Sequence, residues 1–261
     1  MTSQVEIDTM ASNKSVAVKP DNGQLVLMTD TVPDYINAGR GRGSENVEMS
    51  DIVIPRIELI QPLSPAKDKK DPAYIEGIEE GQLFNTVTRQ SYGEHLSFVP
   101  VYFRKVHLLF KARKAGGGFR GSFNSAEEAE AAKRIQDSPG DHEVIECAEH
   151  FCLALNPSGG YEEAIIAMTK TKLKVSRQLN SLVRLRGGDR FSFVYQLGSV
   201  QQKNDKGTYW NFSVKPLGFP AQALYTEASK IYEMIASGDK VIEADHRDLD
   251  TATDDGGNPE M

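Results

Sequence analysis

Alternation of apolar and polar positions over residues 51–238 predicts a fold dominated by β-strands. Strands rich in β-branched and aromatic residues are predicted at 81–88 and 96–111, with hairpins over 151–168 and 191–215. Helical spacing, caps and stop signals predict helices at 125–138, 169–186 and 221–236. This order favours a mainly β fold with inserted helices, an OB-type small β-barrel with a C-terminal helix. A β-sandwich accommodates the mid-chain helices less naturally.

The two flanks of this region differ from it in composition. Residues 1–50 are small, polar and Gly-rich, and their run Gly39–Gly43 is typical of a linker or of an arginine-glycine contact with nucleic acid. Residues 239–261 have few large apolar side chains after Ile242, too few to offset the entropy of ordering. We therefore predict a disordered or weakly ordered segment at 1–50, one domain at 51–238 and a disordered acidic tail at 239–261.

Charge is distributed unevenly along the chain. The whole sequence carries a formal charge of −7, and the tail accounts for −6 of it, with eight acidic residues against Lys240 and Arg247. Residues 1–50 carry −3, so residues 51–238 carry +2. An acidic tail beside a slightly basic body indicates that the tail competes for a polyanion-binding surface, recruits partners, or only improves solubility.

The densest basic stretch covers the second predicted helix and the loop after it. Between residues 170 and 190 seven bases stand against one acid, Asp189. The bases are Lys170, Lys172, Lys174, Arg177, Arg184, Arg186 and Arg190. Lys170, Lys174 and Arg177 recur at i, i+4 and i+7, which places them on neighbouring positions of one helix face. Such a ridge favours phosphate binding through counterion release, and an ordinary solvated helix face is the alternative.

Aromatic and basic residues are interleaved elsewhere in the domain. They are Tyr102, Phe103, Arg104, Lys105, Lys111, Arg113, Phe119, Arg120, Tyr209 and Trp210. Proteins that bind single strands use this pairing, because bases stack on aromatic rings while Lys and Arg follow the backbone. We predict that the bases contact phosphates and the aromatic residues stack on nucleobases. Strand alternation allows only one of Tyr209 and Trp210 to face outward.

Patterns of catalysis and metal binding are weak. The sequence has no phosphate-binding loop, G-x-S-x-G elbow or H-E-x-x-H motif, so we predict a non-enzymatic protein without a cofactor. Carboxylates such as Glu146 leave a Mg²⁺-dependent nuclease as an alternative. His142, Cys147, His150 and Cys152 match the spacing of no common zinc site, so no metal is predicted, and the sequence alone leaves open whether these residues bind one.

Two further features concern the cellular compartment. The two cysteines fit a reducing cytoplasm better than a disulfide framework. No apolar run of about 18 residues occurs, and the N-terminus lacks the features of a signal peptide. The sequence therefore predicts a cytoplasmic protein that has no membrane partner.

Five further motifs are distributed over residues 54–177: Ile54–Ile57 with Gln61–Pro65, Gly81–Asn85, Val99–Phe103, Gly116–Phe119 and Thr171–Arg177. In these motifs the chain resembles a family of phage-encoded single-stranded DNA-binding proteins. The resemblance implies an OB-type fold that coats single-stranded DNA in the cytoplasm of an infected host. It also implies an acidic tail that competes for the basic groove and contacts a polymerase, helicase, primase or nuclease. The tail of this chain departs from a common pattern, because it ends in Asn258–Met261 without an aromatic residue.

The leading prediction is a sequence-independent single-stranded DNA-binding protein of phage DNA replication or recombination, with a tail that modulates binding and recruits partners. A single-strand annealing mediator of recombination, a Mg²⁺-dependent nuclease and a purely structural phage component are the alternatives. The sequence leaves the oligomeric state open, with a dimer among the options.

Overall fold

The computed structural model describes residues 42–47, 51–156, 159–205 and 207–250. The chain divides into two units, residues 1–48 and 49–261. In the first unit only residues 42–47 are described, and they form turns in which the Val47 amide donates to the Ser44 carbonyl. Most of the N-terminal segment predicted at 1–50, including the start of its Arg-Gly run, therefore lies outside the described residues.

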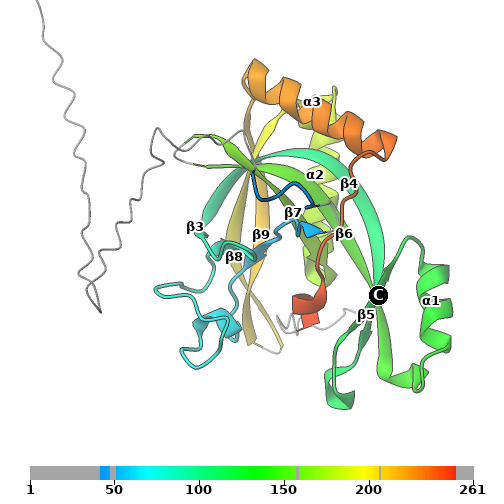
Figure 1. The fold of residues 1–261 in the computed structure, drawn as a ribbon. Coiled ribbons are helices and arrows are strands. Elements are labelled where there is room, and N and C mark those ends of the chain that lie inside the picture. Colours follow the sequence, from blue (N-terminus) through cyan, green and yellow to red (C-terminus); the bar gives the residue numbers. More distant parts are fainter. Residues whose placement is uncertain (1–41, 48–50, 157–158, 206, 251–261) are drawn as a thin grey trace, which may run out of the picture. The chain divides into compact units, whose positions relative to one another are not determined.

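The described part of the second unit contains nine strands and three α-helices (Figure 1). The strands are β1 (Ile57–Leu59), β2 (Leu83–Asn85), β3 (Ser91–Gly93), β4 (His95–Lys111), β5 (Phe119–Phe123), β6 (His142–Leu155), β7 (Tyr161–Thr169), β8 (Val194–Asn204) and β9 (Gly207–Gly218). The helices are α1 (Ala126–Arg134), α2 (Leu173–Arg186) and α3 (Gln222–Ser237), and short 3-10 turns include η5 (Lys170–Lys172), η6 (Arg190–Ser192) and η7 (Arg247–Asp250). The prediction of a mainly β fold with inserted helices is confirmed.

The strands form two antiparallel sheets. The small sheet has the order β1-β2-β3, and the large one has the order β7-β6-β4-β8-β9 with β5 beside β4. Among the described strands no ladder joins β7 to β9, so the path stays open and does not form a closed barrel. The OB-type barrel therefore stays a prediction.

The long strand β4 organises the large sheet. It pairs with β6 from Phe98 to Lys111 and with β8 only from His95 to Phe98, and β5 takes the same edge as β8 farther along. The register shifts between Pro100 and Tyr102, and β4 arches strongly in Figure 1. A bulge of this kind bends a strand and increases its twist, which here curves the sheet around its core.

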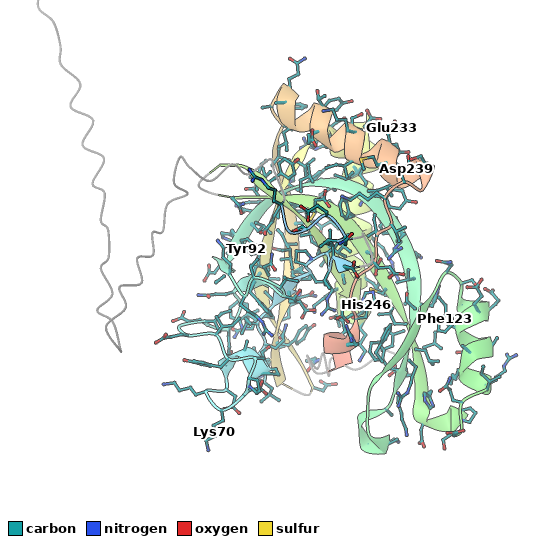
Figure 2. All side chains as sticks on the ribbon, viewed as in Figure 1. Lys70, Tyr92, Phe123, Glu233, Asp239 and His246 are labelled. Atoms are coloured by element: carbon teal, nitrogen blue, oxygen red, sulfur yellow. The ribbon has the colours of Figure 1, made fainter. Side chains whose placement is uncertain are left out.

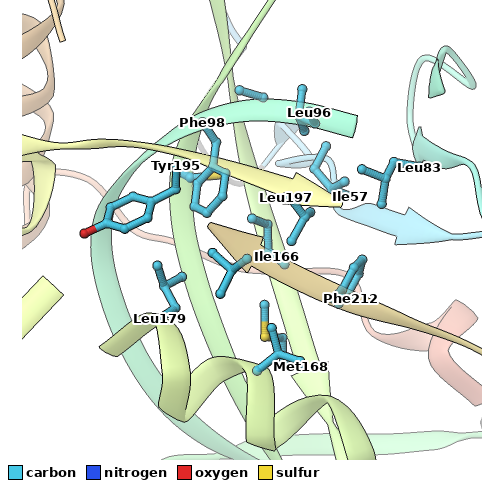
Figure 3. Packing of buried hydrophobic residues seen from close by; sticks show 14 of the residues in the cluster. Ile57, Leu83, Leu96, Phe98, Ile166, Met168, Leu179, Tyr195, Leu197 and Phe212 are labelled. Carbon is cyan, nitrogen blue, oxygen red and sulfur yellow. The ribbon is translucent and has the colours of Figure 1, made fainter. Parts of the chain in front are cut away.

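Each face of the large sheet has its own hydrophobic cluster, because successive side chains of a strand point to opposite faces. One cluster joins Phe98, Ile166, Tyr195 and Phe212 to Leu179 of α2, as Figure 3 shows. The other joins apolar residues of β4 and β6 to α3, Ile54 and the C-terminal segment. The helices α2 and α3 therefore cover opposite faces of the sheet.

Local signals explain the helix ends. The Ser125 side chain accepts a hydrogen bond from the Glu128 amide (3.1 Å), as the capping pattern predicts for α1. Gly187, with φ +71°, ends α2, and Gly238, with φ +84°, ends α3. Glycine tolerates these left-handed angles, so the chain can leave each helix without steric cost.

Residues 239–250, which form the first half of the predicted acidic tail, pack against the body. Ile242 is buried, and Ala244 forms a parallel bridge with Ile54. The Lys240 ammonium pairs with Glu163 (2.7 Å). His246 is buried beside the sheet, with its Nε2 2.5 Å from Glu149 (Figure 2). Composition alone missed these anchors because each depends on a residue far away in the sequence, and residues 251–261 lie outside the described part.

Candidate nucleic-acid interface

The helix α2 displays the basic stretch, and its apolar face decides which side chains remain exposed. Val175 and Leu179 are buried in the core cluster, and the helix packs against β7 and β9. Lys174, Arg177 and Arg184 fall on the opposite side and are exposed. Their spacing of three and seven residues keeps them on one stripe, which we call the α2 stripe.

The bases of the α2 stripe have no acidic partners among the described residues. Lys174, Arg177 and Arg184 take part in no ion pair within the part of the chain that the structure describes. With a rise of 1.5 Å per residue, the stripe is roughly 15 Å long. Three uncompensated cations at this spacing form a local positive potential that attracts polyanions.

The other bases of this segment have different surroundings. Lys170 is exposed in the turn η5, and Lys172 is half-buried with its ammonium 5.3 Å from the centre of the Phe212 ring. Arg186 is exposed at the end of α2, with its guanidinium 5.0 Å from the centre of the Phe193 ring. Cation–π contacts like these orient a side chain while its charge stays available to a ligand.

A buried polar network fixes α2 to the sheet. His150 of β6 has Nε2 2.8 Å from the Ser176 hydroxyl and Nδ1 2.6 Å from Arg190, which also donates to Asn180 (2.9 Å). Because Arg190 can only donate, Nδ1 accepts and the Nε2 proton is donated to Ser176. Burial, followed by the charge of Arg190, holds the pKa of His150 well below its ordinary value. Arg190 is therefore an anchor of the helix rather than part of its exposed surface.

The bases predicted on β4 are partly neutralised. Arg104 lies directly opposite Glu149 in the β4–β6 ladder and pairs with it at 2.5 Å. Lys105 pairs with Glu146 (3.1 Å). Lys111 is half-buried and Arg120 is exposed, whereas the side chain of Arg113 is not described. Arg104, Lys105 and Lys111 lie on β4 and Arg120 lies on β5, whereas Arg113, predicted on the same strand as Lys111, lies in the 3-10 turn η3 (Arg113–Ala115). None of these bases belongs to the α2 stripe.

Most of the predicted stacking residues are half-buried and packed. Phe103 lies against His150 (5.0 Å between ring centres), and Tyr102 lies against Tyr232 (6.4 Å). Phe119 packs on Phe110 in the second core cluster. Because side chains alternate along a strand, Phe103 packs against the first core cluster, and Tyr102 and Phe119 pack against the second.

The two aromatic residues predicted on β9 have separate roles. The Tyr209 hydroxyl donates to Gln202 (2.8 Å), and its ring is half-buried. Trp210 packs against the first core cluster, and Gln61 bonds both its amide (2.9 Å) and its carbonyl (2.8 Å). An added Cβ at Gly81 would lie 2.7 Å from the Trp210 ring. Glycine at residue 81 therefore lets the neighbouring loop close over the indole.

Comparison with known proteins gives one informative match. The family model described as Pam3 phage gp34-like protein matches residues 22–241. The chain belongs to the Pam3 phage gp34-like protein family. No curated protein and no solved structure matches the chain.

This member of the Pam3 phage gp34-like family is therefore a phage protein, and the family description states no activity. The matched residues include β4, α2 and β9, whereas His246 follows the last matched residue. Among the described helices none is long and apolar enough to cross a membrane.

Possible metal ligands in this gp34-like chain divide between the two sheet faces. Along β6, Cys147 faces the second cluster, while His150 and Cys152 face the side of the first. The four residues compared with zinc motifs therefore do not converge. Cys147, Glu149 and His246 do lie within 4.8 Å of one another, a grouping that sequence spacing could not reveal. Burial opposes ionisation of Glu149, but the bonds from His246 and Arg104 outweigh it and lower its pKa.

Proposed function

We propose that this phage protein binds single-stranded DNA independently of sequence, without enzymatic activity, during phage DNA replication or recombination in the host cytoplasm. The observation that carries the proposal is the α2 stripe, with Lys174, Arg177 and Arg184 exposed and without acidic partners in the described region. Contacts from Lys and Arg to phosphates carry no base information, which accounts for sequence independence.

The OB-type architecture belongs to the same proposal. Its support is a curved antiparallel path from β7 through β4 to β9. The helix α2 packs against both end strands of this path, so it bridges the opening that the strands leave. In this arrangement the basic helix fills the opening between β7 and β9, and its α2 stripe faces solvent, where we expect the single strand to bind.

We assign the recruitment of a polymerase, helicase, primase or nuclease to residues after Asp250. Of the eight acidic residues counted in the tail, Asp254, Asp255 and Glu260 follow that position. The preceding part is held on the body through Ile242 and His246. A chain ending at Asp250 should therefore bind oligonucleotides slightly more tightly at low salt, because the remaining acids no longer compete with phosphates.

The decisive experiment is a salt titration of binding to a labelled oligo-dT strand, followed by fluorescence anisotropy beside a matched duplex. Each phosphate neutralised on a single strand contributes about −0.7 to the slope of log K against log salt. The triple variant K174A/R177A/R184A should reduce the magnitude of the slope by about 2. Between 50 and 200 mM salt the wild-type protein should then lose roughly 20-fold more affinity than the variant does.

A matched control removes the same charge elsewhere. The variant K69A/K70A/K230A takes three exposed bases from the loop before β2 and from α3. It should keep the wild-type slope, because these residues lie off the α2 stripe. Equal slopes for the wild-type and stripe variants, or no binding to oligo-dT at low salt, would refute the proposal. Cleavage of the strand in the presence of Mg²⁺ or Mn²⁺ would point to a nuclease instead.

The annealing alternative predicts a different assembly. Mediators that anneal complementary strands act as rings or filaments, whereas the proposed function needs no large oligomer. Light scattering with and without oligo-dT measures the mass of the complex. A large ring or filament would favour the annealing function over simple coating of the strand.

A further inference from the structure

An exposed aromatic ring lies at the end of β9, outside the residues that the sequence pattern singled out. Phe219 follows Gly218 directly and is 76% exposed, whereas Tyr161 and Tyr232 are 37% and 36% exposed. Exposure of a whole phenyl ring to water forfeits the favourable burial that the ring would gain in a core. An exposed ring next to a basic surface is therefore a candidate contact for a ligand.

The Phe219 ring packs against the ring of Phe193. The centres of Phe219 and Phe193 are 5.0 Å apart, with an angle of 40° between the ring planes. Phe193 is buried in the first core cluster and is 8% exposed. This contact holds Phe219 against a rigid part of the fold while leaving most of its own surface open.

The same pair of rings lies beside the basic helix. The guanidinium of Arg186 is 5.0 Å from the centre of the Phe193 ring, so Arg186, Phe193 and Phe219 form one continuous group. Arg186 is exposed and forms no ion pair among the described residues. Arg184 of the α2 stripe lies two residues before it on the same helix. An aromatic face and an unpaired cation thus occur together at the end of α2.

This combination matches the chemistry of one nucleotide in a single strand. A nucleobase has a flat π-face that stacks on a phenyl ring. The phosphate of the nucleotide supplies a negative charge for Arg186, which has no acidic partner in the part of the chain that the structure describes. A duplex keeps its bases stacked inside and offers mainly phosphates. An apolar protein surface would satisfy Phe219 but would bury the charge of Arg186 without compensation.

We propose that Phe219 is a base-stacking residue, and that Phe193, Phe219 and Arg186 form a subsite for one nucleotide of a single strand at the C-terminal end of α2. The subsite rests on the proposed function, because it extends the binding path that begins on the α2 stripe. Base stacking at Phe219 would also make the protein prefer strands with exposed bases, a preference that the charged residues alone do not supply.

The test compares two labelled strands of equal length and charge, oligo-dT and an abasic oligonucleotide. The F219A variant should bind oligo-dT about 5- to 150-fold more weakly than the wild-type protein. Its affinity for the abasic strand and its salt slope should stay unchanged, because the side chain carries no charge. F219W should retain the affinity for oligo-dT, and its added indole fluorescence should be quenched by oligo-dT more than by the abasic strand.

The control variant is I135A, which removes another exposed apolar side chain (83% exposed) at the end of α1. It should bind both strands as the wild-type protein does. Wild-type affinity of F219A for oligo-dT would overturn the subsite, and so would an equal loss on both strands, which would indicate a structural role. If the wild-type protein binds neither strand, the proposed function fails as well. A dimer in light scattering that F219A abolishes, without an effect on DNA affinity, would assign the ring to protein contact.

Discussion

Ile242 anchors the C-terminal segment to the second core cluster, and its removal should destabilise the whole domain. The side chain is 5% exposed and belongs to the cluster that also contains Ile54, Phe151 and Ile231 of α3. Its neighbour Val241 points to solvent and is 59% exposed. Val241 is therefore a matched control position for Ile242, because only Ile242 contributes to the core.

The magnitude follows from burial. Truncation of a buried Ile to Ala costs about 2–4 kcal/mol, from lost transfer free energy and from the cavity that remains. For a domain of this size 1 kcal/mol lowers Tm by about 2–4 °C, so I242A should lower Tm by roughly 4–16 °C. V241A should change the free energy of unfolding by less than about 0.5 kcal/mol, because exposed side chains contribute little.

Urea denaturation of both variants, followed by circular dichroism, measures the free energies of unfolding. Two truncations extend the test, one ending at Gly238 and one at Asp250. The first removes Ile242 together with His246, which bonds the buried Glu149, and should be strongly destabilised. The second should unfold like the full chain. Equal stabilities of I242A and V241A, or a chain ending at Gly238 that is as stable as the full one, would refute the packed C-terminal segment.

Two further predictions concern the core. G81A should lower the free energy of unfolding by about 1–3 kcal/mol more than G93A does, because both glycines have positive φ but only a Cβ at residue 81 meets the Trp210 ring. G81A should also shift the fluorescence of the single tryptophan. Equal losses of stability in the two variants would contradict this reasoning. His150 stays neutral in the fold but gains a proton when unfolded, so the stability of the wild-type protein should fall as the pH drops below about 6.5, by at most about 1.4 kcal/mol per pH unit. H150Q should be less stable than the wild-type protein at pH 7, but its free energy of unfolding should depend less on pH between pH 6.5 and 5. Urea titration at each pH measures both. Parallel pH profiles of the two proteins would argue against a neutral buried His150.

The acidic half of the pH profile has a separate origin. The pKa of Glu149 is lowered in the fold, so its contribution to stability is present above the ordinary glutamate value of 4.5 and is lost as the pH falls through the folded value. This window lies below the one assigned to His150. The comparison of H150Q with the wild-type protein between pH 6.5 and 5 therefore reports on the histidine.

Local signals in the sequence indicated the three helices, although α1 ends at Arg134 rather than at 138 and α2 begins at Leu173 rather than at 169. The Ser125 cap, the apolar spacing of Val175 and Leu179, and the glycines after α2 and α3 act over a few residues of the chain. Burial of one helix face also dictates exposure of the opposite one, so Lys174 and Arg177 lie on one exposed stripe as the spacing predicts. Lys170, predicted on the same helix face, lies instead in the turn η5 before α2, and Arg184 is the third base of the stripe. Sequence also indicated a mainly β fold, since strand propensity and alternation need no knowledge of partners.

Tertiary structure decided the features that depend on distant partners. The first half of β6 has the polar residues Glu143, Glu146 and Glu149, and it became a central strand because β4 pairs with it along its whole length and supplies Arg104 and Lys105 as counter-charges. The faces of the aromatic residues on β4 depended on the bulge between Pro100 and Tyr102, which shifts the alternation of the side chains that follow it.

The C-terminal segment shows the same division most clearly. Its composition predicted a solvated tail, and its sequence does determine the net charge and the scarcity of apolar side chains. Whether the segment stays in solvent, however, depended on Ile54, Glu149 and Glu163, which lie about 80 to 190 residues away along the chain. The buried Ile242, the His246–Glu149 pair and the Lys240–Glu163 ion pair hold the segment on the body, because the folded sheet already presents their partners in place.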